Sequence, residues 1–408
     1  MVKVSGKFLE DVIMWLLKLL GEIAEVQSGG TPLKSKQDYW NGDISWYSSG
    51  ELNDLYTKES KAKITKKGLQ ESNAKLFPKG SLLIGMYDTA ALKMSILDRD
   101  AAFNQAIAGV KPNDDIFDLR FILYTIHSKK LMILNQRRGV RQKNLNLQKI
   151  KNIKIPLPPL EEQKRIVTIL DEAFEGIDKA ILNTQKNLTN AREIFESYLN
   201  SIFTNKGDDW VEKKLGDIAD FRNGLNFTKN SKGESIKIVG VKDFQNHFWI
   251  QEDELETVTI DGQLKEIDRL DKGDILFVRS NGNKELIGRS LLADELSEKT
   301  SYSGFTIRMR IREQDIYNPY VVSFLKSKLL RQQLTKSGSG ISISSLNQNG
   351  LSLIKLSFPS SHKQKSIVNQ LDNLREETQR LETIYKRKIE ALKELKQSIL
   401  QKAFTGKL

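Results

Sequence analysis

The chain has 408 residues, and its 64 Lys and Arg against 52 Asp and Glu give a formal net charge of +12. Hydrophobic residues make up 39% of the chain, which is enough for folded cores and excludes wholesale disorder. There is no cysteine, so disulfides, thiolate nucleophiles and Cys-ligated zinc are excluded, and the composition fits a reducing, cytoplasmic environment. The basic balance favours a polyanionic partner.

The most apolar stretch near the start, Val12–Leu20, is interrupted by Lys18. It is far shorter than the roughly 20 apolar residues that a membrane-spanning helix needs. No basic region precedes it and no small-residue cleavage site follows it, so a signal peptide is not expected. We expect an amphipathic element that packs into a core, and no membrane partner.

Three segments recur in the same order in the two halves of the chain. They are Trp15–Ala24 and Trp210–Ala219, offset by 195, Phe77–Ile84 and Leu270–Phe277, offset by 193, and Ile155–Asp171 and Leu356–Asp372, offset by 201. A solenoid would repeat about every 20–50 residues, whereas these offsets describe one large unit used twice. The sequence therefore predicts an internal duplication with pseudo-twofold symmetry.

Each half has a mixed part followed by a helical part. The mixed parts, residues 1–160 and 204–361, contain short alternating apolar runs typical of strands and one helix-like run each. The strand-like runs include Ser81–Tyr87, Ala106–Lys111, Asp274–Arg279 and Gly304–Ile311, and the helix-like runs are Leu119–Leu134 and Tyr320–Leu334. We predict two similar globules of the α+β (mixed α/β) class.

Two long helices, residues 161–203 and 362–408, are expected to follow the globules. Their apolar residues recur at alternating spacings of three and four, the pattern of a coiled-coil seam. The predicted seam residues are Ile166, Leu170, Ile177, Leu188, Phe195, Ile367, Leu371, Leu374, Leu381, Leu392, Leu395 and Ile399. We expect the helices to pair antiparallel within the chain, although the sequence also allows an intermolecular coiled coil. At about 1.5 Å per residue, each would span roughly 60 Å and act as a rigid spacer.

Acidic residues are missing from two equivalent windows of the halves. Leu119–Leu160 holds ten Lys or Arg, Ile316–Leu371 holds seven, and neither holds Asp or Glu. Carboxylates would repel a phosphate backbone and offset counterion release, so such windows are typical of a surface that binds nucleic acid.

Basic and amide side chains in loops of both halves are candidates for contacts with base edges and phosphates. The loop Arg137–Leu145 is basic, although a merely solvated loop is the alternative, while its counterpart Lys336–Leu346 carries hydroxyls and glycines. The two halves are therefore expected to read different sequences. Predicted DNA-binding residues are Lys34, Lys36, Arg137, Arg138, Arg141, Gln142 and Lys143 in the first globule and Arg222, Asn226, Lys229, Arg279, Asn281 and Lys284 in the second.

Several motifs resemble those of specificity subunits of type I restriction–modification systems. The segment Pro156-Leu-Pro-Pro-Leu-Glu-Glu-Gln163-Lys-Arg-Ile-Val is similar to the one that opens their conserved helix. Supporting motifs are Gly30-Thr-Pro with Tyr39–Ile44, Gly139–Leu145 and the tail Ala403–Leu408. The second half departs from the pattern, because Pro359-Ser-Ser-His-Lys-Gln364 replaces the Pro-Pro-Leu-Glu-Glu-Gln form and Ile343 stands in the place of Gln142.

The resemblance covers essentially the whole chain and implies a non-catalytic, DNA-binding specificity subunit. It implies two target-recognition domains that each read one half of a bipartite duplex site, and helices that fix the unspecific gap. It also implies two methyltransferase subunits, which bind S-adenosylmethionine and dock on the helices, and restriction subunits that use ATP and Mg²⁺. No cofactor or metal is then expected on this chain.

The residues themselves offer little catalytic chemistry. An adenine methyltransferase would need an Asn/Asp-Pro-Pro-aromatic motif, and the nearest segment, Asn318-Pro319-Tyr320, lacks one proline and is better explained as a helix start. The glycine-rich Ser337–Gly340 lacks the Lys-Ser/Thr of an ATP-binding loop. Two alternatives nevertheless stay open at this point, a self-sufficient DNA methyltransferase or nuclease and a structural coiled-coil adaptor.

Overall fold

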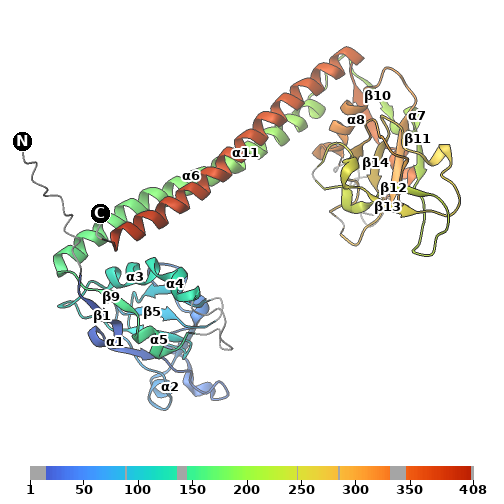
Figure 1. Ribbon diagram of the computed structural model, residues 1–408. Helices are drawn as coiled ribbons and strands as arrows, with labels where there is room; N and C mark the ends of the chain where they lie inside the picture. The colour runs from blue at the N-terminus through green and yellow to red at the C-terminus, as the bar shows by residue number, and fades with distance from the viewer. Residues whose placement is uncertain are drawn as a thin grey trace, which may run out of the picture. The chain divides into compact units, whose positions relative to one another are not determined.

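The protein is described by a computed structural model that covers residues 15–87, 90–135, 145–245, 247–283, 285–330 and 346–405 (Figure 1). The chain divides into two compact units. Unit 1 consists of Met1–Thr184 with Lys388–Leu408, and unit 2 consists of Gln185–Arg387. Two long helices, α6 (Leu160–Thr204) and α11 (Ser361–Ala403), contribute residues to both units.

Unit 1 contains a four-stranded antiparallel sheet and a three-stranded mixed sheet. The first has the order β2-β8-β5-β6, formed by Val26–Ser28, Ile107–Val110, Leu82–Gly85 and Met94–Ile96. The second has the order β4-β3-β7, formed by Ala62–Ile64, Trp40–Tyr47 and Ala101–Phe103, with β3 and β7 parallel. The short strands β1 (Leu17–Leu19) and β9 (Lys154–Pro156) form an antiparallel pair.

Unit 2 repeats this arrangement strand for strand. Its four-stranded sheet has the order β11-β17-β14-β15, formed by Ala219–Asn223, Thr306–Ile311, Ile275–Val278 and Ser290–Leu292. Its mixed sheet has the order β13-β12-β16, formed by Glu256–Thr259, Ser235–Val239 and Thr300–Tyr302, again with a parallel pair, β12 and β16. Strands β10 (Val211–Lys214) and β18 (Lys355–Phe358) pair as β1 and β9 do. The shared order and direction confirm the internal duplication and the mixed fold class.

Inside the globules, the predicted strands are confirmed, whereas the predicted helices are shorter than expected. All four strand-like runs contain a strand, namely β5, β8, β14 and β17. The predicted helix Leu119–Leu134 is instead two helices, α3 (Leu119–Ser128) and α4 (Lys130–Asn135), because the backbone N–H of Lys129 closes α3 on its last carbonyls. Its counterpart α8 (Asn318–Leu325) is likewise interrupted after Leu325, where the N–H of Lys326 donates to carbonyls of the last turn.

Shorter helices complete both globules at matching places. They are α1 (Leu20–Ile23), α2 (Lys66–Gln70) and α5 (Leu147–Lys151) in unit 1, and α7 (Leu215–Ile218) and α10 (Gln348–Ser352) in unit 2. Of the predicted amphipathic element Val12–Leu20, residues 12–14 lie outside the described part of the chain, Leu20 is buried, and Leu16 and Leu17 are 62% and 56% exposed, so only its end packs into the core.

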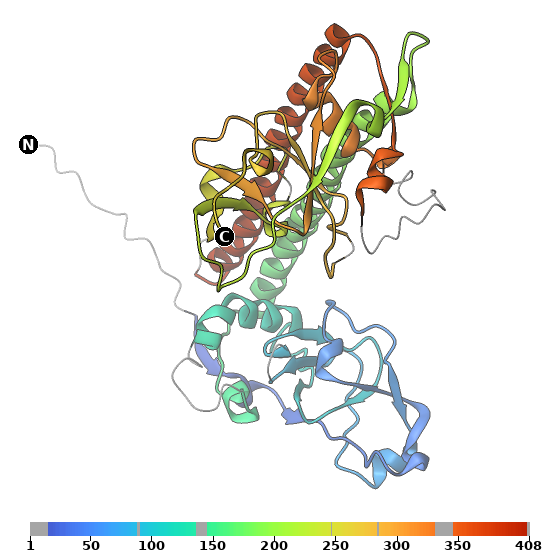
Figure 2. The same cartoon turned by 90° about the vertical axis from the view of Figure 1, so that its right-hand side faces the viewer.

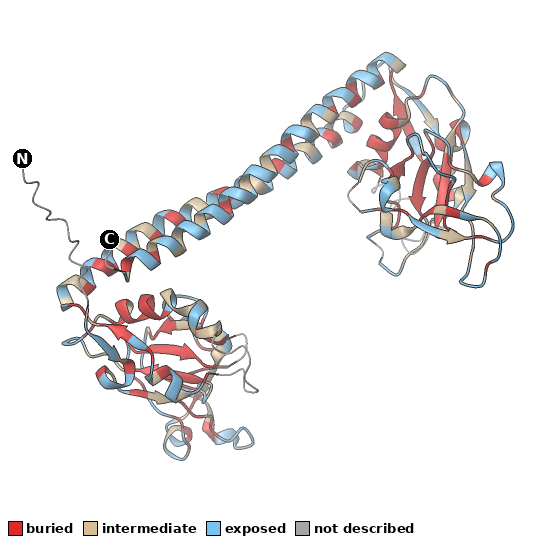
Figure 3. Cartoon of the chain, in the orientation of Figure 1, coloured by how far each residue is buried: buried red, intermediate tan, exposed pale blue. Residues whose placement is uncertain are grey.

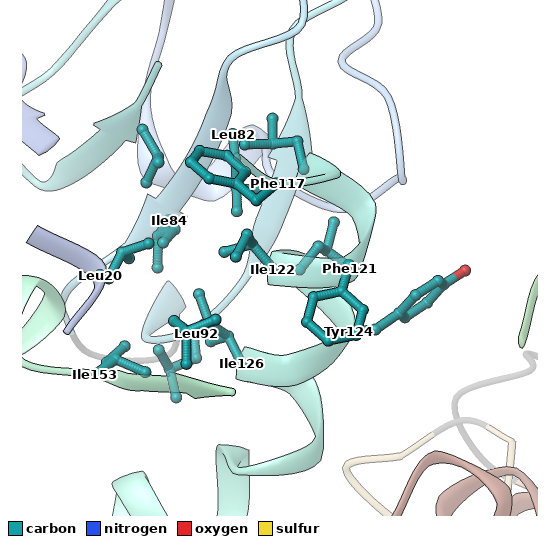
Figure 4. Packing of buried hydrophobic residues seen from close by; sticks show 14 of the residues in the cluster. Leu20, Leu82, Ile84, Leu92, Phe117, Phe121, Ile122, Tyr124, Ile126 and Ile153 are labelled. Atoms are coloured by element: carbon teal, nitrogen blue, oxygen red, sulfur yellow. The ribbon is translucent and has the colours of Figure 1, made fainter. Parts of the chain in front are cut away.

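The main core of unit 1 joins the four-stranded sheet to α3 and to both long helices, and Figure 4 shows the part of it between the sheet and α3. Leu82 and Ile84 of β5 cluster with Ile122 and Ile126, which lie one helical turn apart on α3. The same cluster contains Leu170 and Phe174 of α6 and Leu400 and Ala403 of α11. Burying a side chain of this size contributes about 1.5–3 kcal/mol, so the helices are part of the unit rather than an appendage.

Unit 2 has the equivalent core. Ile275 and Phe277 of β14 cluster with Tyr320 of α8 and with side chains of both long helices, including Phe203 and Leu371. The ring of Phe203 lies 5.3 Å from that of Tyr320, a favourable aromatic contact. Figure 3 shows the buried strands and helix faces at the centre of the globule.

A buried glutamine near the start of α6 ties that helix to its globule. Gln163 is 0% exposed. Its Oε1 accepts a hydrogen bond from the backbone N–H of Asp118 at 3.0 Å, and its Nε2 donates to the carbonyls of Ile116 at 3.2 Å and Pro158 at 2.9 Å. One side chain therefore satisfies three backbone groups of the segments that flank α3 and α6.

Gln364 of α11 makes the same three contacts in unit 2 and is also 0% exposed. Its Oε1 accepts from the N–H of Tyr317 at 2.8 Å, and its Nε2 donates to the carbonyls of Asp315 at 3.0 Å and Pro359 at 2.9 Å. The glutamine shared by the two proline-led motifs is therefore a structural joint, and it survives in the second half although the intervening residues differ.

The long helices lie side by side within each unit (Figures 1 and 2). In unit 2, Arg192 of α6 pairs with Glu382 of α11 at 3.0 Å, and Tyr198 donates to Gln370 at 2.8 Å. Residue numbers rise along α6 as they fall along α11, so the helices are antiparallel there, as predicted. In unit 1, Lys396 of α11 pairs with Asp178 of α6 at 2.6 Å.

Burial sorts the predicted seam residues into three groups. Ile166, Leu170, Ile177, Ile367 and Leu371 are buried, and Leu188, Phe195, Leu374, Leu381, Leu392 and Ile399 are half-buried. Leu395 is 48% exposed, so its assignment to the seam is wrong. Ile389, Leu392, Lys396 and Ile399 follow one another at three- and four-residue steps, which leaves Leu395 one residue off the stripe. Among the described residues, no helix is both long and apolar enough to cross a membrane.

Candidate nucleic-acid interface

A polar hollow of about 630 Å³ lies beyond the end of β2 in unit 1. Thr31, from the segment after β2, donates to Gln105 at 2.5 Å, and Gln105 lies in the connection between β7 and β8. Asn73 and Lys75 enter from a third segment. The hollow thus offers amide, hydroxyl and ammonium groups, which are the donors and acceptors that read base edges.

Lys34 and Lys36 lie in the loop that leads from this hollow to β3. Both are exposed. The Nζ of Lys36 is 2.7 Å from the hydroxyl of Tyr39 and 4.7 Å from the centre of its ring, and Tyr39 in turn donates to Glu71 at 2.7 Å. The hydrogen bond with Tyr39 raises the pKa of Lys36, so this loop presents a fixed positive charge.

Unit 2 has a hollow of about 560 Å³ whose lining includes Lys242, Asn281, Ser303 and Phe305. Phe305 is 62% exposed, which is unusual for a large apolar side chain. Arg279 is fixed beside the hollow, since its backbone N–H donates to the carbonyl of Phe305 at 2.8 Å. Lys242 is paired with Glu256 at 2.5 Å.

The two hollows share one connection of the repeated fold, and their other lining segments differ. The connection between β7 and β8 supplies Gln105 in unit 1, and the equivalent connection between β16 and β17 supplies Ser303 and Phe305 in unit 2. Backbone contacts match as well, because Gly30 donates to the carbonyl of Phe103 at 2.9 Å and Leu225 to that of Tyr302 at 2.8 Å. At this connection the two units thus carry different side chains, which is the requirement for reading different sequences.

Arg222 is held in the sheet rather than in the hollow. It lies on β11, and its Nε donates at 2.5 Å to Asp268, which is 6% exposed. The bond to this carboxylate raises the pKa of Arg222. Lys229 is exposed in the segment after β11. Asn226 lies close to Gly304, where a Cβ would come within 2.2 Å of its Oδ1, so it borders the connection that carries Phe305.

The remaining predicted contact residues lie outside the described part of the chain. They are Arg137, Arg138, Arg141, Gln142, Lys143 and Lys284. The described residue that follows the first of these loops, Leu145, is buried, and its N–H donates to the carbonyl of Met86 at 3.0 Å. The N–H of Leu346 donates to the carbonyl of Arg279 in the same way at 2.8 Å, so Leu145 lies next to the end of β5 and Leu346 next to the end of β14.

The hollows also contain residues that the sequence did not single out. Gln105, Asn73, Lys75, Lys242 and Phe305 come from segments far apart in the chain, and no local pattern marks them. Over the ranges that the structure describes, three or more His, Asp or Glu side chains never gather in a way that suits a metal ion.

A family model with the description "Type I restriction modification DNA specificity domain" matches residues 14–188 and 207–391. One match covers the first half of the duplication and the other covers the second half.

Individual relatives are named specificity subunits of type I restriction enzymes. The EcoR124I/EcoR124II specificity subunit of Escherichia coli is 31% identical over 210 residues, which are 47% of this chain and 50% of that protein. The chain thus spans about half the length of this relative, as it does of the MjaIX specificity subunit of Methanocaldococcus jannaschii, at 54%. The MjaVIII specificity subunit of M. jannaschii is 23% identical over 421 residues, covering 97% of this chain and 93% of that protein.

Solved structures share the fold. A chain from a study of complex assembly and conformational transition of the type I R-M system superposes with a TM-score of 0.76 at 18% identity, over 97% of this chain and 99% of that chain.

Proposed function

Because the chain belongs to the family of type I restriction modification DNA specificity domains, we propose that it is the non-catalytic specificity subunit of a type I restriction–modification complex. Each unit would read one half of a bipartite site in duplex DNA, and α6 and α11 would set the gap between the halves. The methyltransferase and restriction subunits would carry the catalysis, with S-adenosylmethionine, ATP and Mg²⁺ bound to them.

The observation that carries this proposal is the duplicated fold with unlike hollows. Two units with one strand order place their hollows at the same connection. One is lined by Gln105 and Asn73, the other by Asn281 and Phe305. A symmetric DNA site would need like side chains in both, so an asymmetric two-part site is favoured.

Loss of one reading side chain is expected to affect one half-site only. In the assembled methyltransferase, Asn281→Ala should cost about 1–3 kcal/mol for the cognate site and relax one base position. Gln105→Ala should relax a position in the other half. The measurement is a map of methylated adenines in DNA modified by each complex. A wild-type map without a two-part motif would contradict the proposed function, and uniform loss at every site would make the residue a phosphate contact.

An apolar stripe on the long helices supports docking of a partner in unit 2. Ile194 and Tyr198 lie one turn apart on α6 and are 52% and 36% exposed. Tyr198 donates to Gln370 of α11. Ile384, 45% exposed, is 14 residues after Gln370, about four turns, so it lies on the same side. Leu395 occupies in α11 the position of Ile194 in α6, by the offset of 201, which offers a second partner copy an equivalent contact.

Charging this stripe is expected to break assembly without unfolding the chain. Ile194→Glu with Ile384→Glu should weaken binding of the methyltransferase subunit by about 100-fold, since buried apolar anchors dominate such interfaces. The free energy of unfolding should change by only about 0.5 kcal/mol, because both side chains are exposed. Thr189→Glu with Thr383→Glu is the matched control, because these exposed residues lie off the stripe. Equal loss in both double variants, measured by calorimetry, would argue against the assignment.

A further inference from the structure

A second hollow in unit 2, of about 520 Å³, is separate from the one that carries Asn281 and Phe305. Its walls come from three places: α6 through Asn200, the segment before β15 through Arg289 and Ser290, and the end of α8 through Lys326 and Lys328. Its charged groups are Arg289, Lys326, Lys328 and one carboxylate, Glu196, and they lie among apolar side chains.

Two of these cations have no acidic partner among the described residues. The Nζ of Lys326 donates to the carbonyls of His247 and Ser290, both at 3.0 Å, which uses two of its three N–H groups. Arg289 donates from one terminal nitrogen to the carbonyls of Phe244 at 3.3 Å and Gln245 at 3.4 Å. Both side chains are thereby held in place by neutral oxygens and keep donors for another ligand.

The nearby carboxylates are already committed to other cations. Glu196 lies 3.4 Å from Lys328, and Asp372 lies 2.5 Å from Arg375. Arg375 itself stacks on the ring of Phe248 at 4.7 Å, which brings a further positive charge to this side of the unit.

The surroundings of the Lys326 ammonium disfavour its charged form. Desolvation of this group, reinforced by the charges of Arg375 and Arg289, lowers its pKa to about 8. Holding two positive groups together without a carboxylate costs free energy, and an anion in the hollow would recover it.

Arg289 of this hollow lies near the strand end that carries the candidate DNA face. β15 pairs with β14, and the N–H of Val278 donates to the carbonyl of Arg289 at 3.0 Å. Arg289 therefore lies directly beside the end of β14 that leads to Arg279 and Asn281. Leu330, which also lines the hollow, belongs to the acid-free window Ile316–Leu371.

We propose that Arg289 and Lys326 form a backbone-phosphate site for duplex DNA, next to the surface of unit 2 that reads bases. The site rests on the proposed function and adds to it a contact that fixes the register of the duplex without selecting a sequence. A free phosphate ion offers the same chemical group as the DNA backbone, and the test below distinguishes these two ligands.

The test measures binding of a short fluorescent duplex to the full chain between about 50 and 200 mM salt. Arg289→Gln with Lys326→Gln should lower the slope of log affinity against log salt by about 1.8, because each phosphate contact contributes about 0.9. Affinity at the lower salt concentration should fall about tenfold for each charge removed. The charge-preserving pair Arg289→Lys with Lys326→Arg should keep the slope.

The control removes two charges elsewhere in unit 2. Lys265→Gln with Lys272→Gln alters two exposed residues in the segment between β13 and β14. An unchanged slope for the Arg289 and Lys326 double variant, with wild-type binding intact, would overturn the phosphate site and leave the proposed function standing. Absence of duplex binding by the wild type would overturn both. A third outcome would assign the hollow to a free anion instead. In that outcome, inorganic phosphate at fixed ionic strength stabilises the wild type against heat but not the double variant, while the salt slope of the double variant stays unchanged.

Discussion

Replacing Gln364 with leucine is expected to lower the free energy of unfolding of unit 2 by about 3 kcal/mol. Leucine fills nearly the same volume, so the loss comes from hydrogen bonding rather than from a cavity. The N–H of Tyr317 and the carbonyls of Asp315 and Pro359 would lose their partner. A buried polar group without a partner costs about 1–3 kcal/mol, and three such groups at about 1 kcal/mol each give this total.

Urea unfolding followed by hydrogen exchange would measure and localise this loss. Gln364→Leu should speed exchange in unit 2, whereas Gln163→Leu should speed it in unit 1, where the equivalent bonds are made. Gln185→Leu is the control, because Gln185 is exposed on α6. If Gln364→Leu unfolded at the same urea concentration as the wild type, the glutamine would not be a structural joint.

The architecture was predictable from the sequence because the duplication shows each sequence pattern twice, once in each half. The match of Phe77–Ile84 with Leu270–Phe277 anticipates that β5 and β14 take the same central place in their sheets. Helix continuity was harder, because α3 ends on backbone bonds at Lys129 that leave no mark in an apolar pattern. Leu395 shows a similar limit, since an apolar residue one position off the stripe looks like a seam residue when only spacing is available.

The candidate interface was only partly predictable, for a reason that lies in the topology. Asn281 follows a recognisable strand, so its place at a strand end could be anticipated. Gln105 meets Thr31 across 74 residues of sequence, and Phe305 becomes exposed only through the turn into β17. Arg222 illustrates the opposite case, a basic residue near a loop whose carboxylate partner, Asp268, lies 46 residues away.

Gly224 connects the stability of unit 2 to its candidate DNA face, because no side chain fits at this position. It follows β11, and a Cβ there would lie 2.2 Å from the carbonyl oxygen of Ser303 and 2.4 Å from that of Tyr302. Atoms of these types cannot approach so closely, and both neighbours are backbone, so one strand end must move. Gly224→Ala is therefore expected to destabilise unit 2 by about 3 kcal/mol, the upper end of ordinary overpacking.

The displacement should reach the hollow, since the next residue, Leu225, donates to the carbonyl of Tyr302 at 2.8 Å and accepts from the N–H of Gly304 at 2.7 Å. Asn226 and Phe305 lie at this crossing, so Gly224→Ala should weaken recognition of one half-site even below the temperature at which unit 2 unfolds. Gly50→Ala, at a position where a Cβ meets nothing within 4 Å, is the control and should leave both properties near wild type. If Gly224→Ala unfolded at the same urea concentration as the wild type, the contact between Gly224 and the turn before β17 would have to accept a Cβ without destabilising unit 2.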